Sequence, residues 1–180
     1  MRWSSCLAAL PLLAACASPT QSPDFLAQEL SAQILASSSA TLTLEKWCAD
    51  HAMAANPKIV ARLVRGDAKP ASAETIERLG ASDIKYRRVQ LYCGAHLFSE
   101  ADNWYVPSRL TPEMNRLLDE TDTPFGKVVL PLAPYRRTFD SRMLQSPTAL
   151  FEHRAVLYNS AHLPIAEVRE TYQRGALAFL

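Results

Sequence analysis

Two glutamates in the late segment Pro-Ile-Ala-Glu-Val-Arg-Glu-Thr-Tyr, residues 164–172, are of a type that can perform general acid–base chemistry. Successive residues of a strand face opposite sides, so Glu170 shares a face with Val168 while Glu167 shares one with Arg169. A carboxyl group on an apolar face loses hydration, which raises its pKa and makes it a better proton donor. The alternation therefore favours Glu170 as the acid, while a surface ion pair with a nearby arginine is the alternative role for either glutamate.

Arg88 is a second residue suited to a small-molecule site. It lies in Arg-Arg-Val-Gln-Leu-Tyr-Cys, residues 87–93. A guanidinium group can donate two parallel hydrogen bonds to a carboxylate and keeps its charge when it does so. Alternation groups Arg88 with Gln90 and opposes it to Val89, so the pattern alone makes this arginine a solvated residue on a polar strand face.

The N-terminus carries a short apolar segment that ends in a cysteine. Between Arg2 and Cys16 the chain is apolar or small over about fourteen residues, whereas a membrane-spanning helix needs roughly 20, so the segment is typical of a secretory signal. The motif Leu-Ala-Ala-Cys, residues 13–16, resembles the bacterial lipobox and implies that Cys16 is lipidated. Ala17 after the cysteine implies an outer-membrane destination by the same resemblance. The predicted organisation is a signal peptide over 1–15, a tether over 16–23 and a folded domain over 24–180.

Two further cysteines each precede a histidine by three residues. Cys48 with His51 and Cys93 with His96 could supply four tetrahedral zinc ligands. The usual zinc pairings have a different spacing, and two cysteines of an exported chain pair more simply as a disulfide. We favour the disulfide between Cys48 and Cys93, with free buried thiols and zinc as the alternatives.

Composition excludes several other classes of function. Without Arg2, the Lys and Arg residues fall from 19 to 18 and equal the 18 Asp and Glu residues, and no basic stripe points to nucleic acid. The 5 glycines form no phosphate-binding loop, and no nucleophile elbow is present.

The elements that position these residues follow from capping signals and hydrophobic periods. Thr111 followed by Pro112 is a strong helix start, and Gly80 is a typical helix stop. Helices are predicted over residues 22–39, 41–51, 72–80 and 111–121. Strands are predicted over residues 57–66, 84–94, 97–107, 126–132, 135–140, 153–159 and 164–172. Late strands without intervening helices favour an α+β fold with an antiparallel sheet.

Three stretches of the sequence, taken in order, resemble the chorismate pyruvate-lyase family and its ligand-binding relatives. The family runs from an arginine on a strand, through a strand ending in Val-Pro and a Thr-Pro-apolar-Gly turn, to a late strand with a glutamate. The corresponding segments here are residues 87–111, 121–129 and 164–172, and the resemblance covers roughly residues 43–173. It implies a single curved antiparallel sheet with helical flaps over an internal ligand cavity.

The resemblance also implies roles for individual residues. Arg88 would bind the ring carboxylate, and Glu170 would protonate or hydrogen-bond the departing ether oxygen. Further substrate contacts are expected from Phe125, Gly126, Leu44 and Trp104, the last as an apolar wall that we add by our own inference.

The implied function is an exported lipoprotein enzyme, a carbon–oxygen lyase that converts chorismate or a related enolpyruvyl cyclohexadiene to a 4-hydroxybenzoate-type product and pyruvate. Aromatisation drives this reaction, so neither a metal nor an organic cofactor is expected. The alternative is a lipoprotein that binds an aromatic carboxylate in the same cavity without chemistry. Either protein is expected to be a monomer at the periplasmic face of the outer membrane, attached only through its N-terminal lipid.

Overall fold

The computed structural model describes residues 22–66 and 68–180 of the chain. The predicted signal peptide, most of the predicted tether and the predicted lipidation site Cys16 lie outside these residues, and the predicted organisation into signal, tether and domain stays a prediction. None of the helices in the described part of the chain is long and apolar enough to cross a membrane.

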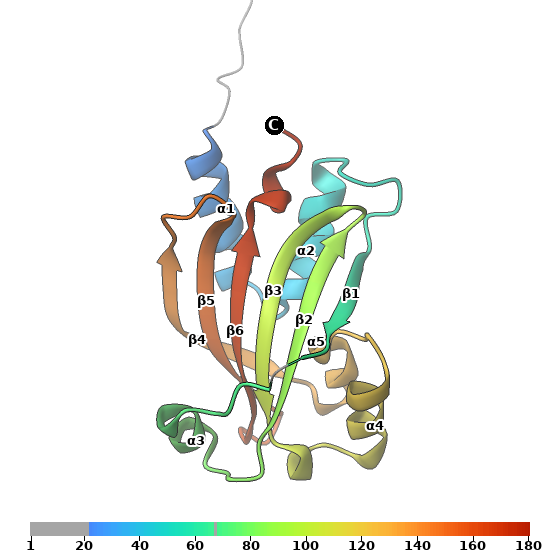
Figure 1. The fold of residues 1–180 in the computed structure, drawn as a ribbon, viewed down its shortest axis with the longest axis vertical. Coiled ribbons are helices and arrows are strands. Elements are labelled where there is room, and N and C mark those ends of the chain that lie inside the picture. Colours follow the sequence, from blue (N-terminus) through green and yellow to red (C-terminus); the bar gives the residue numbers. More distant parts are fainter. Residues whose placement is uncertain (1–21, 67) are drawn as a thin grey trace, which may run out of the picture.

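A six-stranded antiparallel sheet forms the centre of the fold, with strand order β1-β2-β3-β6-β5-β4 (Figure 1). The strands are β1 (Ile59–Val64), β2 (Lys85–Cys93), β3 (His96–Tyr105), β4 (Tyr135–Met143), β5 (Ala149–Tyr158) and β6 (Pro164–Gln173). All neighbouring strands pair antiparallel. The predicted α+β class with a single antiparallel sheet is therefore confirmed.

Five α-helices and three short 3-10 helices surround the sheet in the described residues. The α-helices are α1 (Pro23–Leu35), α2 (Ala40–Asp50), α3 (Ala73–Leu79), α4 (Pro112–Glu120) and α5 (Phe125–Val128). The 3-10 helices are η1 (Pro107–Arg109), η2 (Leu130–Leu132) and η3 (Arg174–Leu177). Four of the α-helices begin at a serine or threonine whose side chain accepts a hydrogen bond from a backbone N–H of the first turn, which satisfies a donor that the helix itself cannot.

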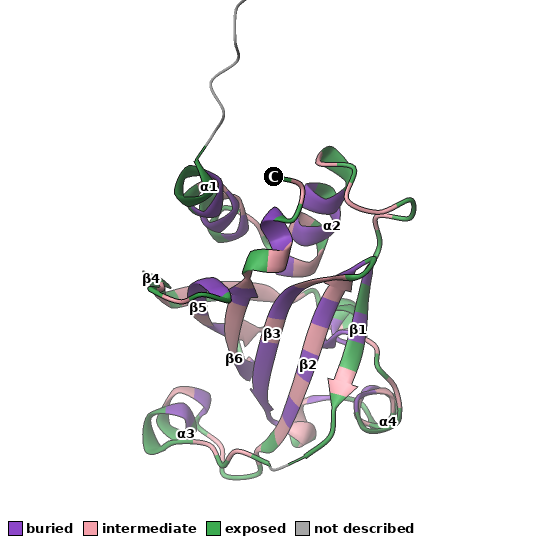
Figure 2. Cartoon of the chain, turned by 45° about the horizontal axis from the view of Figure 1, so that its top comes forward, coloured by how far each residue is buried: buried purple, intermediate pink, exposed green. Residues whose placement is uncertain are grey.

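Helices α1 and α2 cover one face of the sheet, which we call the helix face, and bury their apolar side chains against it (Figure 2). In α1 the buried Leu26, Leu30 and Ile34 follow one another at intervals of four residues, which places them on one side of the helix. Trp47 of α2 is buried in the same core and donates a hydrogen bond from its indole N–H to the Ala176 carbonyl at 2.9 Å. These contacts hold both helices over the sheet.

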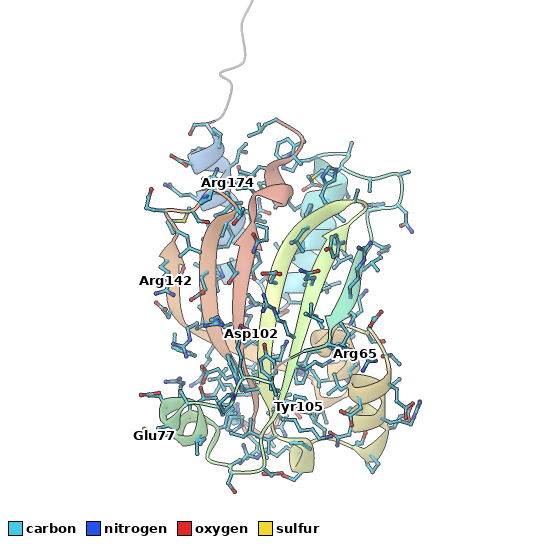
Figure 3. The ribbon with its side chains drawn as sticks, in the orientation of Figure 1. Arg65, Glu77, Asp102, Tyr105, Arg142 and Arg174 are labelled. Atoms are coloured by element: carbon cyan, nitrogen blue, oxygen red, sulfur yellow. A yellow bond between two sulfur atoms is a disulfide. The ribbon has the colours of Figure 1, made fainter. Side chains whose placement is uncertain are left out.

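The opposite face, which we call the outer face, carries charged side chains in ion pairs. Asp102 of β3 lies on it, over the middle of the sheet (Figure 3), and pairs with Lys69 at 3.1 Å. Helix α3 covers one end of the outer face, where Arg78 pairs with the fully buried Glu167 at 2.8 Å.

Residues 126–132 correct one prediction, because they form α5 and η2 and not a strand. Phe125, Val128 and Val129 are buried together against α4, and their spacing of three and four residues is that of a helical turn. Pro131 then lies in the 3-10 turn that follows. A run of β-branched residues this short takes its conformation from the surface against which it packs.

A disulfide joins Cys48 of α2 to Cys93 at the end of β2, with a Cα–Cα distance of 6.2 Å that suits this bond. Over residues 22–66 and 68–180, no three or more His, Cys, Asp or Glu side chains gather in a way that could hold a metal ion.

Gly175 of η3 packs directly on the β2–β3 hairpin, which leads to a stability prediction. A Cβ at this position would lie 2.2 Å from the Leu97 carbonyl oxygen, so Gly175→Ala should lower the free energy of unfolding by about 1 to 3 kcal/mol, the usual cost of overpacking. A Cβ at Gly126 of α5 meets nothing within 4 Å, so Gly126→Ala is the matched control and should leave stability unchanged or slightly raised. Urea denaturation measures both, and equal effects of the two substitutions would contradict the packing.

Candidate functional site

The pairing register of the sheet assigns each predicted site residue to a face. Glu170 of β6 lies opposite Ala101, which in turn lies opposite Val89, and all three face α1 and α2. Arg88 directly precedes Val89 in β2 and pairs with Asp102 of β3. Because neighbouring residues of a strand face opposite sides, Arg88 is on the outer face and Glu170 is on the helix face.

A cavity of about 150 Å³ lies between the helix face, the start of α2 and α5. Its apolar lining includes Leu42, Phe125, Leu130, Leu157 and Val168, and its polar lining includes Ser38, Ser39, Thr41, Asn103, Tyr135, Arg136 and Glu170. Three residues singled out from the sequence, Phe125, Gly126 and Glu170, thus lie together around one cavity.

An ion pair forms the polar end of this cavity. The Arg136 guanidinium lies 2.9 Å from a Glu170 carboxylate oxygen, and their side chains are 8% and 13% exposed. The Tyr172 hydroxyl donates to the same oxygen at 3.0 Å. Within the described residues Arg136 Nε is buried without a hydrogen-bond partner, so this N–H remains available.

Burial and charge act in opposite directions on the pair. Burial alone would lower the pKa of Arg136, but the neighbouring Glu170 carboxylate outweighs it and holds the pKa above its usual value. Burial raises the pKa of Tyr172 well above its usual value, and the charge of Glu170 adds to that shift. Arg136 therefore stays charged, and Tyr172 stays a hydrogen-bond donor.

His153 of β5 lies directly across from Glu170 on the helix face. It is fully buried, and its Nε2 lies 2.9 Å from the Ser31 hydroxyl of α1. Burial lowers the pKa of His153 to about 4, so the ring is neutral at pH 7. The histidine thus contributes no charge beside the ion pair.

Arg88 and Glu170 do not form one site, which corrects the expected pairing of these two residues. Arg88 lies 3.1 Å from Glu100 and 4.0 Å from Asp102, two carboxylates of the outer face. The arginine that meets Glu170 is Arg136 of β4. Sequence reasoning missed it, because Arg136 and Arg137 are adjacent and only the β4–β5 register decides which of them faces the cavity.

Trp104 and Leu44 also lie away from the cavity lining, which corrects their expected roles. Trp104 is on the outer face, where its indole N–H donates to the Lys69 carbonyl at 2.9 Å and its ring lies 5.7 Å from that of Tyr86. Leu44 is fully buried in the core between α2 and the sheet. The apolar character of these two side chains did not show whether they line the cavity or pack elsewhere in the fold.

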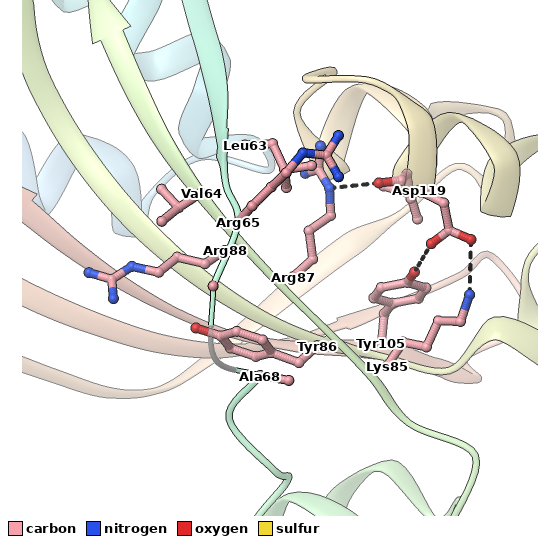
Figure 4. A pocket seen from close by; sticks show the side chains of 12 residues that line it. Leu63, Val64, Arg65, Ala68, Lys85, Tyr86, Arg87, Arg88, Tyr105 and Asp119 are labelled. Carbon is pink, nitrogen blue, oxygen red and sulfur yellow. Dashed lines mark hydrogen bonds and ion pairs between the residues drawn. The ribbon is translucent and has the colours of Figure 1, made fainter.

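A second pocket, of about 320 Å³, opens at the edge of the sheet where β1 ends (Figure 4). It is lined by Arg65, by Lys85, Tyr86, Arg87 and Arg88 of β2, and by Tyr105 and Asp119, among others. Burial lowers the pKa of Arg87 below its usual value, which the charges around it only partly offset. This pocket has a larger volume than the cavity and more basic side chains around it.

Solved structures with a similar fold come from transcriptional regulators. PhnF from Mycobacterium smegmatis matches with a TM-score of 0.50 and 12% identity over 64% of this chain and 58% of that one. The PhnF effector domain (TM-score 0.49, 14% identity) covers 64% of this chain and 81% of that one. The ligand-binding domain of a GntR-family regulator from Bordetella bronchiseptica (TM-score 0.47, 16% identity) covers 64% and 82%. The chain therefore spans less than two thirds of that PhnF chain.

These comparisons correct the recognition made from the sequence. The expected curved-sheet fold is present, but it is also the fold of a regulator, so the fold by itself does not indicate a lyase. The assignment to the chorismate pyruvate-lyase family is therefore wrong. The predicted function as a chorismate-converting lipoprotein, and its alternative as a lipoprotein that binds an aromatic carboxylate, are wrong as well. The predicted location rests on residues outside the described ranges and stays a prediction.

No family model matches the sequence. The uncharacterized protein y4mC from Sinorhizobium fredii (strain NBRC 101917 / NGR234) is 40% identical over an alignment that covers 84% of this chain and 75% of that protein. The chain belongs to the family of y4mC.

Proposed function

We propose that this domain binds one small, uncharged, ring-sized molecule in the cavity on the helix face. The observation that carries the proposal is the Arg136–Glu170 pair, which forms the charged end of a cavity that also has apolar walls. Ligand sites typically combine apolar walls with a few convergent polar groups. A purely structural ion pair needs no cavity beside it.

The size of the cavity limits the ligand to about one ring. An apolar cavity of about 150 Å³ in another protein holds benzene, and the cavity here has a volume of about 150 Å³. The rings and branched side chains of Phe125, Leu157 and Val168 supply the apolar contacts.

The charges of the cavity favour a ligand without net charge. Arg136 and Glu170 neutralise one another at 2.9 Å, so a charged ligand would leave one of them without its partner in a buried place. Arg136 Nε can donate one more hydrogen bond, and the second oxygen of Glu170 can accept one. A hydroxyl or amide group on the ring satisfies both.

Three probes of similar size test this function, namely benzamide, benzoate and toluene. Benzamide should bind with a Kd on the order of 1 mM, a usual affinity for a ligand of nine non-hydrogen atoms. Toluene lacks the polar group and should bind roughly 3- to 10-fold more weakly, the equivalent of one neutral hydrogen bond. Ligand-observed NMR titration measures all three.

A cavity-filling variant provides the control for location. Val168→Phe places a ring inside the cavity and should abolish benzamide binding, while the circular dichroism spectrum reports that the sheet is retained. Val60→Phe is the matched substitution on an exposed position of β1 and should leave binding unchanged. Benzamide binding that survives Val168→Phe would refute the proposed cavity.

Glu170→Gln should switch the preference from the neutral probe to the charged one. The substitution leaves the buried Arg136 without its counter-charge, so benzoate affinity should rise roughly 10- to 100-fold, the range for a hydrogen bond between charged groups. Glu167→Gln is the matched control, because Glu167 is a buried, paired glutamate of the same strand on the outer face. A rise in benzoate affinity for both variants, or for neither, would contradict the assignment of the ion pair.

A further inference from the structure

The pocket at the edge of the sheet arises because two strand pairings end at different places. The last β1–β2 pair is Val64 with Arg88, whereas the β2–β3 pairing continues to Lys85 with Tyr105. The first three residues of β2 therefore extend beyond the paired part of β1. Figure 4 shows their side chains around the resulting hollow, which has a volume of about 320 Å³ and is closed on one side by α4.

The charges around this pocket are unbalanced. Among the residues that the structure describes, four cationic ones line it, Arg65, Lys85, Arg87 and Arg88, against the single carboxylate of Asp119. Lys85 lies 2.9 Å from that carboxylate and neutralises it. Arg88 is balanced from outside the pocket, by Glu100 at 3.1 Å. Two positive charges, those of Arg65 and Arg87, have no ion-pair partner within the described residues.

Arg87 is the unusual member of this group, because it is only 4% exposed. Its guanidinium donates to the carbonyl oxygens of Leu118 at 3.1 Å and of Thr121 and Thr123 at 2.9 Å each. Its Nη1 is buried and has no hydrogen-bond partner in the described part of the chain. Nearby carboxylates, among them Asp119 and Asp122, offset the cost of burying this cation only in part. An anion in the adjoining pocket would offset more of it.

We propose that this pocket is a second ligand site, which binds a small molecule through an oxyanion, a phosphate or a carboxylate group. Arginine is the side chain best suited to either oxyanion, because its planar donors match the geometry of two oxygen atoms. The pocket is larger than a single oxyanion requires, and Tyr86 and Leu63 provide apolar wall for the remainder of the ligand. The site is separate from the cavity on the helix face and does not depend on the function proposed for that cavity.

Calorimetric titration with inorganic phosphate and, separately, with succinate tests the site. Chloride replaces the probe in the reference so that ionic strength stays constant, because screening alone changes weak binding between charges. Saturable one-to-one binding is expected for at least one probe. Binding of phosphate alone identifies a phosphorylated ligand, binding of succinate alone identifies a carboxylate ligand, and binding of both assigns the shared oxyanion chemistry; each result supports the site.

Variants decide where the probe binds. Arg65→Ala removes an exposed pocket arginine and should weaken the Kd at least 10-fold, whereas Arg137→Ala removes an exposed arginine of β4 outside the pocket and should leave it unchanged. Val168→Phe, which fills the other cavity, should also leave the Kd unchanged, so this site and the proposed cavity can fail independently. No saturable binding of either probe, or equal weakening by Arg65→Ala and Arg137→Ala, would overturn the proposal.

Discussion

Reduction of the disulfide between Cys48 and Cys93 should lower the free energy of unfolding by about 4 kcal/mol. The bond closes a loop across a sequence separation of 45 residues, and the entropy that such a loop removes from the unfolded chain corresponds to about 4 kcal/mol. The loss should be large here because the bond ties α2, which covers the helix face, to the end of β2. Urea denaturation of the oxidised and the reduced protein gives the difference directly.

The control is a double variant, Cys48→Ala with Cys93→Ala. It should be less stable than the oxidised protein, and its stability should no longer respond to the reductant. Counting thiols on the denatured, unreduced protein checks the bond itself, since Cys48 and Cys93 should contribute none. A reductant effect below about 1 kcal/mol would place this bond outside the range usual for loops of this length.

Acidification from pH 6.5 to pH 4 should cost about 3 kcal/mol of stability through His153 alone. Burial lowers the pKa of His153 from 6.5 to about 4, so within this window the unfolded chain binds a proton that the folded chain does not. Stability that depends on the neutral ring is therefore fully present above pH 6.5 and falls as the pH drops toward 4. The size of the effect follows from about 1.4 kcal/mol for each pH unit.

The contribution of His153 is isolated by comparing variants, because carboxylates also titrate in acid. His153→Gln keeps a polar partner for Ser31 and should flatten the dependence of unfolding free energy on pH between 4 and 6.5. His162→Gln, at an exposed histidine, should retain the dependence of the parent protein. The same slope in His153→Gln and in the parent would show that another group is responsible.

The sequence alone determined the fold class and most of the elements. Serine and threonine caps, the stop at Gly80 and the apolar periods are local signals, and they are sufficient to predict the four longer helices and six of the seven predicted strands. The exception is residues 126–132, where a short β-branched run becomes helical because Phe125 and Val128 pack against α4. Alternation within β6 also placed Glu170 and Glu167 on opposite faces of one strand, as they are in the structure.

Only the tertiary structure decided which residues share a site. Within a strand, alternation relates neighbouring side chains to each other, but it does not say which face of one strand continues into which face of the next. The register does so, and it places Arg88 beside Asp102, while it brings Arg136 from β4 to Glu170 of β6. Likewise, the basic pocket exists because the last residue of β1 pairs with Arg88, three residues after the start of β2, a difference between two pairings that no single segment encodes. Pairing between strands depends on long-range packing, and for that reason the site could not be derived from local pattern.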